Sequence, residues 1–301
     1  MRLVSFLPPG LAAAEEETPL AAARLGALAE ESVIDLAAAD GTMPSSMMAL
    51  LALGPSGITR ARAALEAGLR SRSRGVRHAL AAVRLLAPVP RPGKILGIGR
   101  NYGAHAAEGG LARQEKPRIF VKLSTSVIGT GTPIQKPRAV AKLDYETELA
   151  VVIGAAGRDI AEGDALAHVA GYTILNDVSA RELQFDVSPP QTSFAKSMDG
   201  FCPMGPALAT PDEFADAADI QLRGFLNGEE VQSASTRDMI FPVPALIAYL
   251  SGYVTLEPGD VIATGTPAGV GAFRKPPRYL EPGDVVRMEI PGIGVLENSI
   301  V

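Results

Sequence analysis

From residue 89 to residue 301, the chain consists of short apolar runs separated by Gly, Pro, Asn and Asp. Runs of this length bounded by turn-forming residues are typical of β-strands. We expect strands near 94–98, 117–122, 148–154, 169–175, 220–226, 260–264, 284–290 and 293–299. Helices are expected only near 178–185, 211–217 and 242–250. This part of the chain is therefore predicted to be a β-dominated α+β domain with a rolled or barrel-like sheet.

Two turn sequences support this prediction. Asn227-Gly228 lies between two of the runs, and this dipeptide favours a two-residue β-hairpin. The sequence Leu-Glu-Pro-Gly-Asp-Val occurs at 256–261 and again at 280–285, and Pro-Gly fits the two central positions of a type II turn. We interpret both copies as turns that lead into strands, and not as units of a repeat fold.

The first 88 residues have a different character, being rich in Ala, Leu and Arg. Helical periodicity is present near 45–53 and 59–70, with Thr59 as the expected N-cap of the second helix. The stretch 24–36 fits either a helix or a strand pair turning at Glu30-Glu31. Three prolines and a glycine in 87–93 indicate an extended connector. We therefore expect a small N-terminal α/β domain over 1–88 and a second domain over 89–301.

Composition excludes several classes of protein. With a net charge of −5, the chain has no excess of positive charge with which to attract nucleic acid or an anionic membrane. No apolar stretch approaches the length of a membrane span, and Met1–Pro9 is too short and broken for a secretion signal. The single cysteine, Cys202, allows no intrachain disulfide and is expected to be a small core residue. We therefore expect a cytoplasmic protein with no nucleic-acid or membrane partner.

Three acids form the most suggestive group of polar residues. Glu146 and Glu148 are two apart at the start of a predicted strand, so they share a face and repel each other. Asp177 ends another apolar run, and if the two strands meet, three carboxylates converge. Oxygen ligands alone suit Mg²⁺ or Mn²⁺ better than Zn²⁺. The alternative is two solvent-facing glutamates and a helix N-cap at Asp177. The strand beginning at Glu148 reads as buried on both faces, which favours the metal site.

His105 and Glu108 form a second candidate group. Residues three apart lie on one face of a helical turn, and a carboxylate beside an imidazole fixes its tautomer and raises its basicity. This is the arrangement that a general base needs. Gly109 and Gly110 would let the segment move as a lid. The alternative is a surface helical turn with a weak ion pair, and spacing alone does not decide between the two.

Two further features are candidates for binding an anion. Lys196 lies in a Gly/Pro-rich segment between Phe194 and Met198 and is expected to be half-buried. Near a metal it could stabilise an oxyanion, and the alternative is a lysine whose ammonium reaches water. The small-residue loop 263–271 could bind a carboxylate through its backbone N–H groups and the Thr266 hydroxyl. It lacks the Gly-Lys-Ser/Thr ending of a phosphate loop.

Several of these segments, taken together and in order, resemble the fumarylacetoacetate hydrolase family. They are 94–102, His105-x-x-Glu108, 117–122, 144–150, 176–184, 196–206 and 263–271. The match runs from about residue 85 onward, while the N-terminal part is similar to the bacterial members only in length and general character. The resemblance implies a mixed β-roll catalytic domain over 89–301, a homodimer, and Mg²⁺ or Mn²⁺.

The resemblance also assigns roles to individual residues. The family's metal ligands fall on Glu146, Glu148 and Asp177. Its His–Glu dyad on a closing lid falls on His105 and Glu108, and its oxyanion lysine falls on Lys196. The substrate-contacting positions fall on Arg181, Gln184, Thr266 and Lys122.

The functional hypothesis is a metal-dependent hydrolase that cleaves a C–C bond in a 2,4-diketo acid of the acylpyruvate or fumarylpyruvate type. The metal would hold the carboxylate and the adjacent keto oxygen. His105, oriented by Glu108, would activate water for attack on the distal carbonyl, and Lys196 would stabilise the oxyanion. The carbon leaving group would depart as a metal-bound enolate.

Several alternatives stay open. Isomerisation of a hydroxymuconate-type diacid, decarboxylation of oxaloacetate and dehydration of a sugar-derived 2-keto acid all use an enolate at the same site. A non-catalytic metal-binding or ligand-binding protein of the same fold is a different class, against which the intact dyad and the three acids argue.

Overall fold

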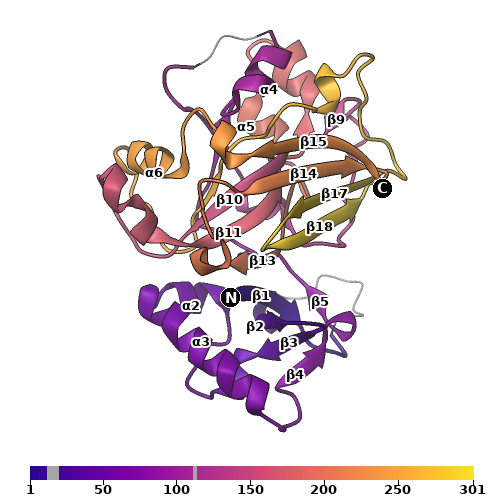
Figure 1. The fold of residues 1–301 in the computed structure, drawn as a ribbon. Coiled ribbons are helices and arrows are strands. Elements are labelled where there is room, and N and C mark those ends of the chain that lie inside the picture. Colours follow the sequence, from indigo (N-terminus) through magenta and orange to yellow (C-terminus); the bar gives the residue numbers. More distant parts are fainter. Residues whose placement is uncertain (12–19, 111–113) are drawn as a thin grey trace.

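The computed structural model describes residues 1–11, 20–110 and 114–301. Figure 1 shows the elements of the N-terminal segment gathered at one end of the molecule, below the rest. They are β1 (Arg2–Leu7), β2 (Arg24–Ala29), β3 (Ser32–Asp35), α1 (Leu36–Ala39), α2 (Met47–Leu51), α3 (Pro55–Arg70), β4 (Arg77–Ala79) and β5 (Arg84–Leu85). Of the two alternatives for 24–36, the strand pair is confirmed, with its turn at Glu30 in the left-handed region (φ 51°).

The prediction that a helix begins after an N-cap at Thr59 is wrong. Helix α3 begins at Pro55, with Gly54 as its N-cap. Proline presets the backbone angle of the first helical turn and has no N–H group that needs a partner there. Thr59 lies inside the helix, where its hydroxyl donates to the Pro55 carbonyl (3.3 Å).

The remainder of the chain is dominated by strands, as predicted. Its elements up to residue 186 are β6 (Ile95–Gly99), α4 (Gly103–Glu108), β7 (Arg118–Lys122), β8 (Val127–Ile128), β9 (Leu143–Asp144), β10 (Thr147–Ile153), β11 (Val169–Asn176), β12 (Ser179–Ala180) and a π-helical turn (Glu182–Asp186). Those that follow are α5 (Thr192–Ala195), β13 (Cys202–Ala209), β14 (Gln221–Leu226), β15 (Glu229–Ser235), α6 (Val243–Ser251), β16 (Val261–Ala263), β17 (Val285–Ile290) and β18 (Gly294–Ser299).

Three expectations for this part need correction. No α-helix covers 178–185, because β12 pairs with β9 there before the π-helical turn. Only a short 3₁₀ turn, Pro211–Glu213, is present in 211–217. Strand β13 was not predicted, since Pro203 and Pro206 interrupt its sequence and argue against a central strand.

The predicted turns are confirmed. Asn227 (φ 51°) and Gly228 (φ 86°) join β14 to β15 as a hairpin. Gly259 (φ 89°) and Gly283 (φ 97°) each occupy the second central position of a Pro-Gly turn. The turns are closed by hydrogen bonds from Asp260 N to Glu257 O and from Asp284 N to Glu281 O, each 3.0 Å.

The strands of the described part form one large sheet and two smaller ones. The 12-stranded sheet has the order β4-β3-β2-β1-β13-β11-β10-β16-β6-β7, with β5 paired to β1 and β8 paired to β13. A four-stranded sheet has the order β15-β14-β17-β18, and β12 pairs with β9. Strand β1 hydrogen-bonds to β13, so the large sheet contains strands from both sides of residue 88. A domain boundary at that residue stays a prediction.

Strand β10 is buried on both faces, as its sequence indicates. Leu149, Val151 and Ile153 pack into a core cluster shared with β14, β17 and α6. Ala150 and Val152 point the other way, into a cluster shared with α2 and α3. No helix in the described ranges is long and apolar enough to cross a membrane.

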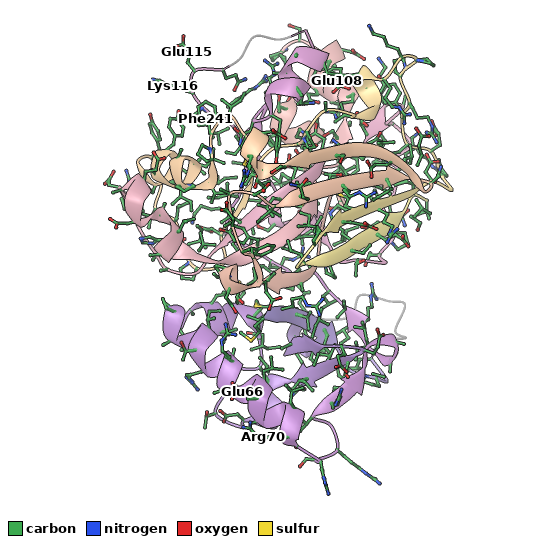
Figure 2. The ribbon with its side chains drawn as sticks, viewed as in Figure 1. Glu66, Arg70, Glu108, Glu115, Lys116 and Phe241 are labelled. Carbon is green, nitrogen blue, oxygen red and sulfur yellow. The ribbon has the colours of Figure 1, made fainter. Side chains whose placement is uncertain are left out.

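Several strand ends meet at one edge of the large sheet. Strands β6 and β16 are parallel and both end at this edge, while β10 begins there and β11 ends there. Each of these ends leads to, or follows, a segment with polar side chains. Figure 2 shows Glu108, at the end of α4, on the opposite side of the molecule from Glu66 and Arg70 of α3.

Candidate functional site

The three predicted ligand carboxylates lie together at this edge. Asp177 N donates to Glu146 O (3.0 Å), which places the residue after β11 beside the residue before β10. Candidate ligand oxygens of Glu146, Glu148 and Asp177 lie within 4.8 Å of one another, and all three residues are buried. The solvent-facing alternative therefore does not hold, and this buried Glu-Glu-Asp group could hold a metal ion.

Glu148 is the member of this group that a bound cation would stabilise most. Burial and the nearby Asp177 and Glu146 carboxylates raise the pKa of Glu148 well above its usual range. Burial acts in the same direction on Glu146, but the Lys196 and Arg181 cations outweigh it and hold the pKa of Glu146 below its usual range. A divalent cation would relieve the repulsion that opposes ionisation of Glu148. The residues present therefore fit a hard divalent ion with oxygen ligands.

Lys196 is fully buried, and the expectation of half-burial is wrong, because acceptors surround its ammonium group. Nζ donates to Glu146 Oε2 (2.9 Å), Asp177 Oδ2 (2.6 Å) and Ser179 Oγ (2.7 Å). Burial lowers the pKa of this ammonium, but the Asp177 and Glu146 carboxylates raise it above its ordinary value. The carboxylates thus favour the charged form of Lys196, and its predicted role beside an oxyanion stays a prediction.

Lys122 lies behind the carboxylates and does not line the pocket described below. Its Nζ is completely buried and donates to Asp177 Oδ1 (2.6 Å) and to the backbone carbonyl of Lys196. The residue positions Asp177, and its placement gives no support to the predicted contact with substrate.

We expect Lys122→Met to lower the free energy of unfolding by about 3–5 kcal/mol, because the Asp177 carboxylate loses one partner of a buried ion pair. Urea unfolding in EDTA, followed by circular dichroism, measures this change. Lys142→Met is the matched control, since the Lys142–Asp186 pair (2.7 Å) has side chains 41% and 47% exposed. Exposed pairs contribute about 0–1 kcal/mol. Equal losses in the two variants would contradict the role given to Lys122.

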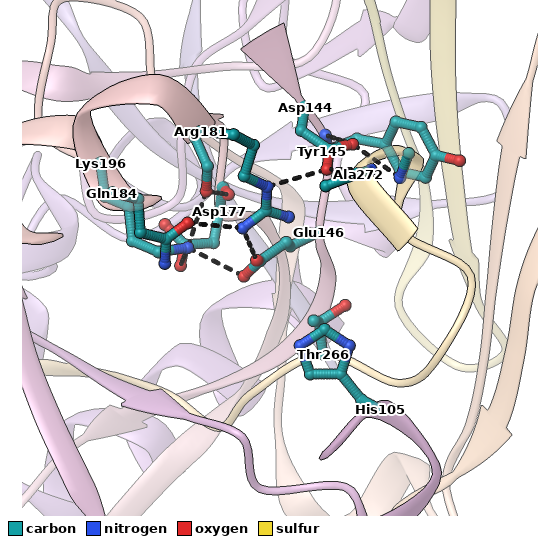
Figure 3. A network of polar contacts seen from close by, with 12 residues as sticks. His105, Asp144, Tyr145, Glu146, Asp177, Arg181, Gln184, Lys196, Thr266 and Ala272 are labelled. Carbon is teal, nitrogen blue, oxygen red and sulfur yellow. Dashed lines mark hydrogen bonds and ion pairs between the residues drawn. The ribbon is translucent and has the colours of Figure 1, made fainter. Parts of the chain in front are cut away.

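Arg181 is held between two acids at the wall of the pocket (Figure 3). Its Nε donates to Asp144 Oδ2 (2.8 Å), and its Nη1 lies 2.7 Å from Glu146 Oε1 and donates to Gln184 Oε1 (2.8 Å). Its Nη2 is buried and has no hydrogen-bond partner among the described residues. An unused donor on a pocket wall is suited to bind an anion.

Asp144, to which no role was assigned from the sequence, fixes Arg181 to a distant loop. Its Oδ1 accepts hydrogen bonds from Tyr145 N (2.9 Å) and Gly271 N (2.8 Å), and its Oδ2 accepts one from Ala272 N (2.9 Å). A Cβ at Gly271 would lie 2.6 Å from Asp144 Oδ1, so only glycine allows this close approach. Figure 3 shows Asp144 joining Ala272 to Arg181.

The loop 263–271 holds carboxylates of the protein itself. Gly265 N donates to Glu148 Oε2 (2.9 Å). Gly269 N donates to both oxygens of Glu108 (3.2 and 3.1 Å). These two N–H groups therefore already have acceptors within the chain, and binding of a ligand carboxylate by the rest of the loop stays a prediction.

The Thr266 hydroxyl is also engaged. It donates to Thr147 O (3.1 Å) and accepts a hydrogen bond from Gln232 Nε2 (2.8 Å). Thr266 nevertheless lines the pocket, so its contact with substrate stays a prediction.

His105 of α4 lines the pocket and is only 8% exposed, although Ala104, Ala107 and Glu108 of the same helix are exposed. Figure 3 shows its ring beside Thr266. Its Nδ1 lies 3.6 Å from Glu108 Oε2 and has no hydrogen-bond partner among the described residues. Hydrogen bonds of a catalytic pair are often long in the absence of substrate. Since Gly269 N fixes Glu108, the pair is docked against the loop that also carries Thr266.

One pocket contains most of the predicted site residues. It is lined by Ile98, Gly99, Arg100, His105, Arg118, Phe120, Glu146, Arg181, Gln184, Phe185, Thr192, Lys196, Thr266 and Phe273. The sequence reasoning missed Arg100, Arg118, Phe120 and Phe273. The alternation of β7 could have indicated two of them, because Arg118, Phe120 and Lys122 share one face of that strand.

Comparison with known proteins places this site in a family. Residues 94–301 match the family model described as Fumarylacetoacetate (FAA) hydrolase C-terminal. The chain is 43% identical over 270 residues to the mitochondrial oxaloacetate tautomerase of Xenopus laevis, a match that covers 90% of this chain and 83% of that relative.

Two solved structures resemble the whole chain at 32% identity. A 2-hydroxyhepta-2,4-diene-1,7-dioate isomerase from Mycobacterium marinum has a TM-score of 0.74, with coverage of 100% of this chain and 98% of that chain. The maleylpyruvate hydrolase from Sphingobium sp. SYK-6, in complex with manganese(II) and pyruvate, has a TM-score of 0.79, with coverage of 100% and 99%. The chain therefore belongs to the fumarylacetoacetate hydrolase family of enzymes, as the resemblance predicted.

Proposed function

We propose that this chain is a metal-dependent enzyme that interconverts the keto and enol forms of a 2-keto dicarboxylic acid of the oxaloacetate type. The observation that carries the proposal is a pocket lined by His105, Arg181, Lys196 and Glu146, of which Glu146 belongs to the buried group of three carboxylates. The Xenopus laevis relative, named an oxaloacetate tautomerase, supports this reaction over others of the family.

A divalent ion held by Glu146, Glu148 and Asp177 would supply Lewis-acid polarisation of the 2-keto oxygen and of the carboxylate beside it. Mg²⁺ and Mn²⁺ are the proposed ions, because the three candidate ligands are carboxylates. The manganese complex of the similar maleylpyruvate hydrolase supports this choice.

The chain's own residues bind the substrate and move the proton. Arg181 Nη2, which has no acceptor among the described residues, donates to an oxygen of the 2-keto acid. The positive charge of Lys196 stabilises the negative charge that develops on the keto oxygen. His105 takes a proton from the carbon next to the keto group, and the proton is returned to the keto oxygen to give the enol. Glu108 stabilises the imidazolium during this transfer, since it lies 3.6 Å from His105 Nδ1.

A second candidate is hydrolysis of a C–C bond in a 2,4-diketo acid. The proximity of Glu108 to His105 favours it, because such a pair can also take a proton from water. The similarity to maleylpyruvate hydrolase supports it as well. Hydrolysis consumes water and releases two acids, whereas tautomerisation leaves the carbon skeleton intact.

The test compares the two reactions in one protein preparation loaded with Mn²⁺ or Mg²⁺. The approach of oxaloacetate to its keto–enol equilibrium is followed by enol absorbance, and cleavage of a panel of acylpyruvates is followed by loss of diketo acid absorbance. We expect EDTA-sensitive acceleration of the first reaction. Acceleration of acylpyruvate cleavage alone would favour the second candidate. The absence of both activities would favour a non-catalytic binding protein.

The homodimer expected from the resemblance has a candidate surface, which we propose is covered by a second copy of this chain. Ile119 and Val121 alternate with buried residues along β7, and Leu123 follows directly after the strand. The three are 38%, 48% and 56% exposed. Phe194 of α5 is 60% exposed, and Val121 N donates to Ser193 Oγ of the same helix (3.3 Å). Exposed apolar groups gathered in this way mark an interaction surface.

We expect Val121→Lys to convert a dimer into a monomer, because a charge would be buried in the interface. Light scattering after size-exclusion chromatography measures the mass. Leu69→Lys on α3 is the control, since Leu69 is also 48% exposed. A wild-type protein that elutes as a monomer, or a Val121→Lys variant that stays dimeric, would contradict this surface.

The cellular location is a separate proposal. The single cysteine is consistent with a reducing cytoplasm, whereas the Xenopus laevis relative is named as mitochondrial. Localisation of the full chain in its own cells decides between them.

A further inference from the structure

Two arginines at the end of the β6–β7 pair line the pocket and have no part in the chemistry described so far. Gly99, the last residue of β6, pairs with Arg118, the first residue of β7, and Arg100 follows Gly99 directly. Because Gly99 has no side chain, Arg118 lies against it, with Cδ 3.6 Å from the position that a Cβ would take. The two guanidinium groups thus belong to one corner of the pocket.

Neither arginine has a side-chain hydrogen bond or an ion pair within residues 1–11, 20–110 and 114–301. Other arginines do, for example Arg24 with Asp35 and Arg278 with Asp284. Burial and the charge of Arg118 lower the pKa of Arg100, which is half-buried, whereas Arg118 is exposed. Two like charges without a counter-ion are unfavourable, and a bound anion would relieve the repulsion.

The backbone holds Arg100 in an uncommon conformation. Its φ of 61° lies in the left-handed region, which is unfavourable for residues with a side chain. The following residue, Asn101, is fully buried, and its Nδ2 donates to Phe241 O (3.0 Å) and Thr264 O (2.8 Å). Strain that the surroundings enforce in this way is typical of binding sites.

Along one face of β7, Phe120 lies between Arg118 and Lys122, and Lys122 is bonded to Asp177 of the carboxylate group. Lys196 Nζ is 5.0 Å from the centre of the Phe120 ring. Arg118 is two residues before Phe120 on the same face of β7, which corresponds to about 7 Å along a strand. The pocket therefore has Lys196 against Phe120 and the arginine pair two residues away on the same face of β7, so an acid with a carboxylate at each end has a cation for each.

We propose that Arg100 and Arg118 bind the second carboxylate of a dicarboxylic substrate whose 2-keto acid end lies at Lys196. This inference rests on the function proposed above for the same pocket, and it adds the two residues that recognise the second carboxylate. Arginine suits the task, because its planar guanidinium can bind a carboxylate through two hydrogen bonds.

The test is binding to the Mn²⁺-loaded protein, measured by calorimetry with oxaloacetate, which has two carboxylates, and with pyruvate, which has one. We expect Arg118→Met and Arg100→Met each to raise the Kd for oxaloacetate about tenfold to a hundredfold, as for the loss of a hydrogen bond to a charged group. The Kd for pyruvate should stay unchanged. In turnover, KM for oxaloacetate should rise while kcat is kept.

Two controls accompany these variants. Arg158→Met changes an exposed arginine that does not line the pocket and should leave both Kd values unchanged. Arg118→Lys keeps the charge without the planar group and should recover part of the affinity for oxaloacetate. It also keeps the proposal testable if Arg100→Met fails to fold.

Two results would overturn the proposal: an unchanged Kd for oxaloacetate, or an equal rise of the Kd values for oxaloacetate and pyruvate. The second result would mean that the arginines only support the shape of the pocket. Because the Kd values are obtained separately from the rate of tautomerisation, a chain that prefers diacids but does not tautomerise them would refute the proposed function alone. A chain that tautomerises oxaloacetate with unchanged KM in both Met variants would refute the arginine site alone.

Discussion

Glu148→Gln is expected to raise the thermal unfolding midpoint of the metal-free protein and to abolish the further rise that Mn²⁺ gives to the wild type. Burial and the Asp177 and Glu146 carboxylates raise the pKa of Glu148. In the absence of metal, the folded chain therefore keeps a proton on Glu148 at pH values at which the unfolded chain has lost it. Glutamine imitates this protonated form and removes the repulsion.

The pH dependence of this effect has a definite sign. A carboxyl group with a raised pKa contributes its full stability below its unfolded pKa of about 4.3, and this stability is lost as pH rises through the folded pKa. Each pH unit in that interval costs the metal-free wild type about 1.4 kcal/mol. The advantage of Glu148→Gln should therefore be small near pH 4 and should increase toward neutral pH.

With Mn²⁺ present, the wild type should be the variant that gains stability. A ligand present at a hundredfold excess over its Kd stabilises the folded state by about 2.7 kcal/mol. The wild type should show such a rise with Mn²⁺, and Glu148→Gln should not. Glu108→Gln is the matched control, since Glu108 is a carboxylate near the same loop but outside the ligand group, and it should keep the rise. An undiminished rise in Glu148→Gln would remove Glu148 from the metal site.

His105→Ala is expected to lower turnover by about 10²–10⁴-fold, the usual contribution of a positioned acid–base group. Binding of Mn²⁺ should stay intact, because the three candidate ligand side chains are carboxylates and none comes from α4. Turnover with saturating substrate and Mn²⁺ titration by calorimetry measure the two properties separately.

Glu108→Gln provides the comparison for His105. It should lower turnover less than His105→Ala, because the amide oxygen can still accept the hydrogen bond from Gly269 N while the negative charge facing His105 is lost. Unchanged turnover in His105→Ala would exclude the residue as the base. A loss of Mn²⁺ affinity in that variant would instead place His105 at the metal.

The parts of the candidate site that could be predicted depend on how side chains repeat along a single strand or helix. Glu146 and Glu148 share a face because strand side chains alternate, and His105 faces Glu108 because helix residues three apart are neighbours. The burial of Glu148 followed from the apolar run behind it. The sequence could not show which distant segment supplies an acceptor, as for the amides of Gly265 and Gly269.

The same distinction applies to the fold. The hairpin at Asn227-Gly228 was predictable, since its turn chemistry is contained in two residues. Strand β13 was not, because pairing with β1 and β11 outweighs the local preference of its prolines. The α-helix expected at 178–185 is absent, because pairing of β12 with β9 again outweighs the local preference of the sequence.

The sequence by itself determined the family, the predominance of strands and the identity of the three acids, since these depend on residue type and on spacing along one segment. Only the tertiary structure decided the charge state of the site. Lys196 stays charged in the interior because Glu146, Asp177 and Ser179 meet its ammonium from other segments. Arg100 and Arg118 form a pair only because β6 and β7 end side by side. Electrostatic energies depend on distances through space and on burial, and neither is set by position along the chain.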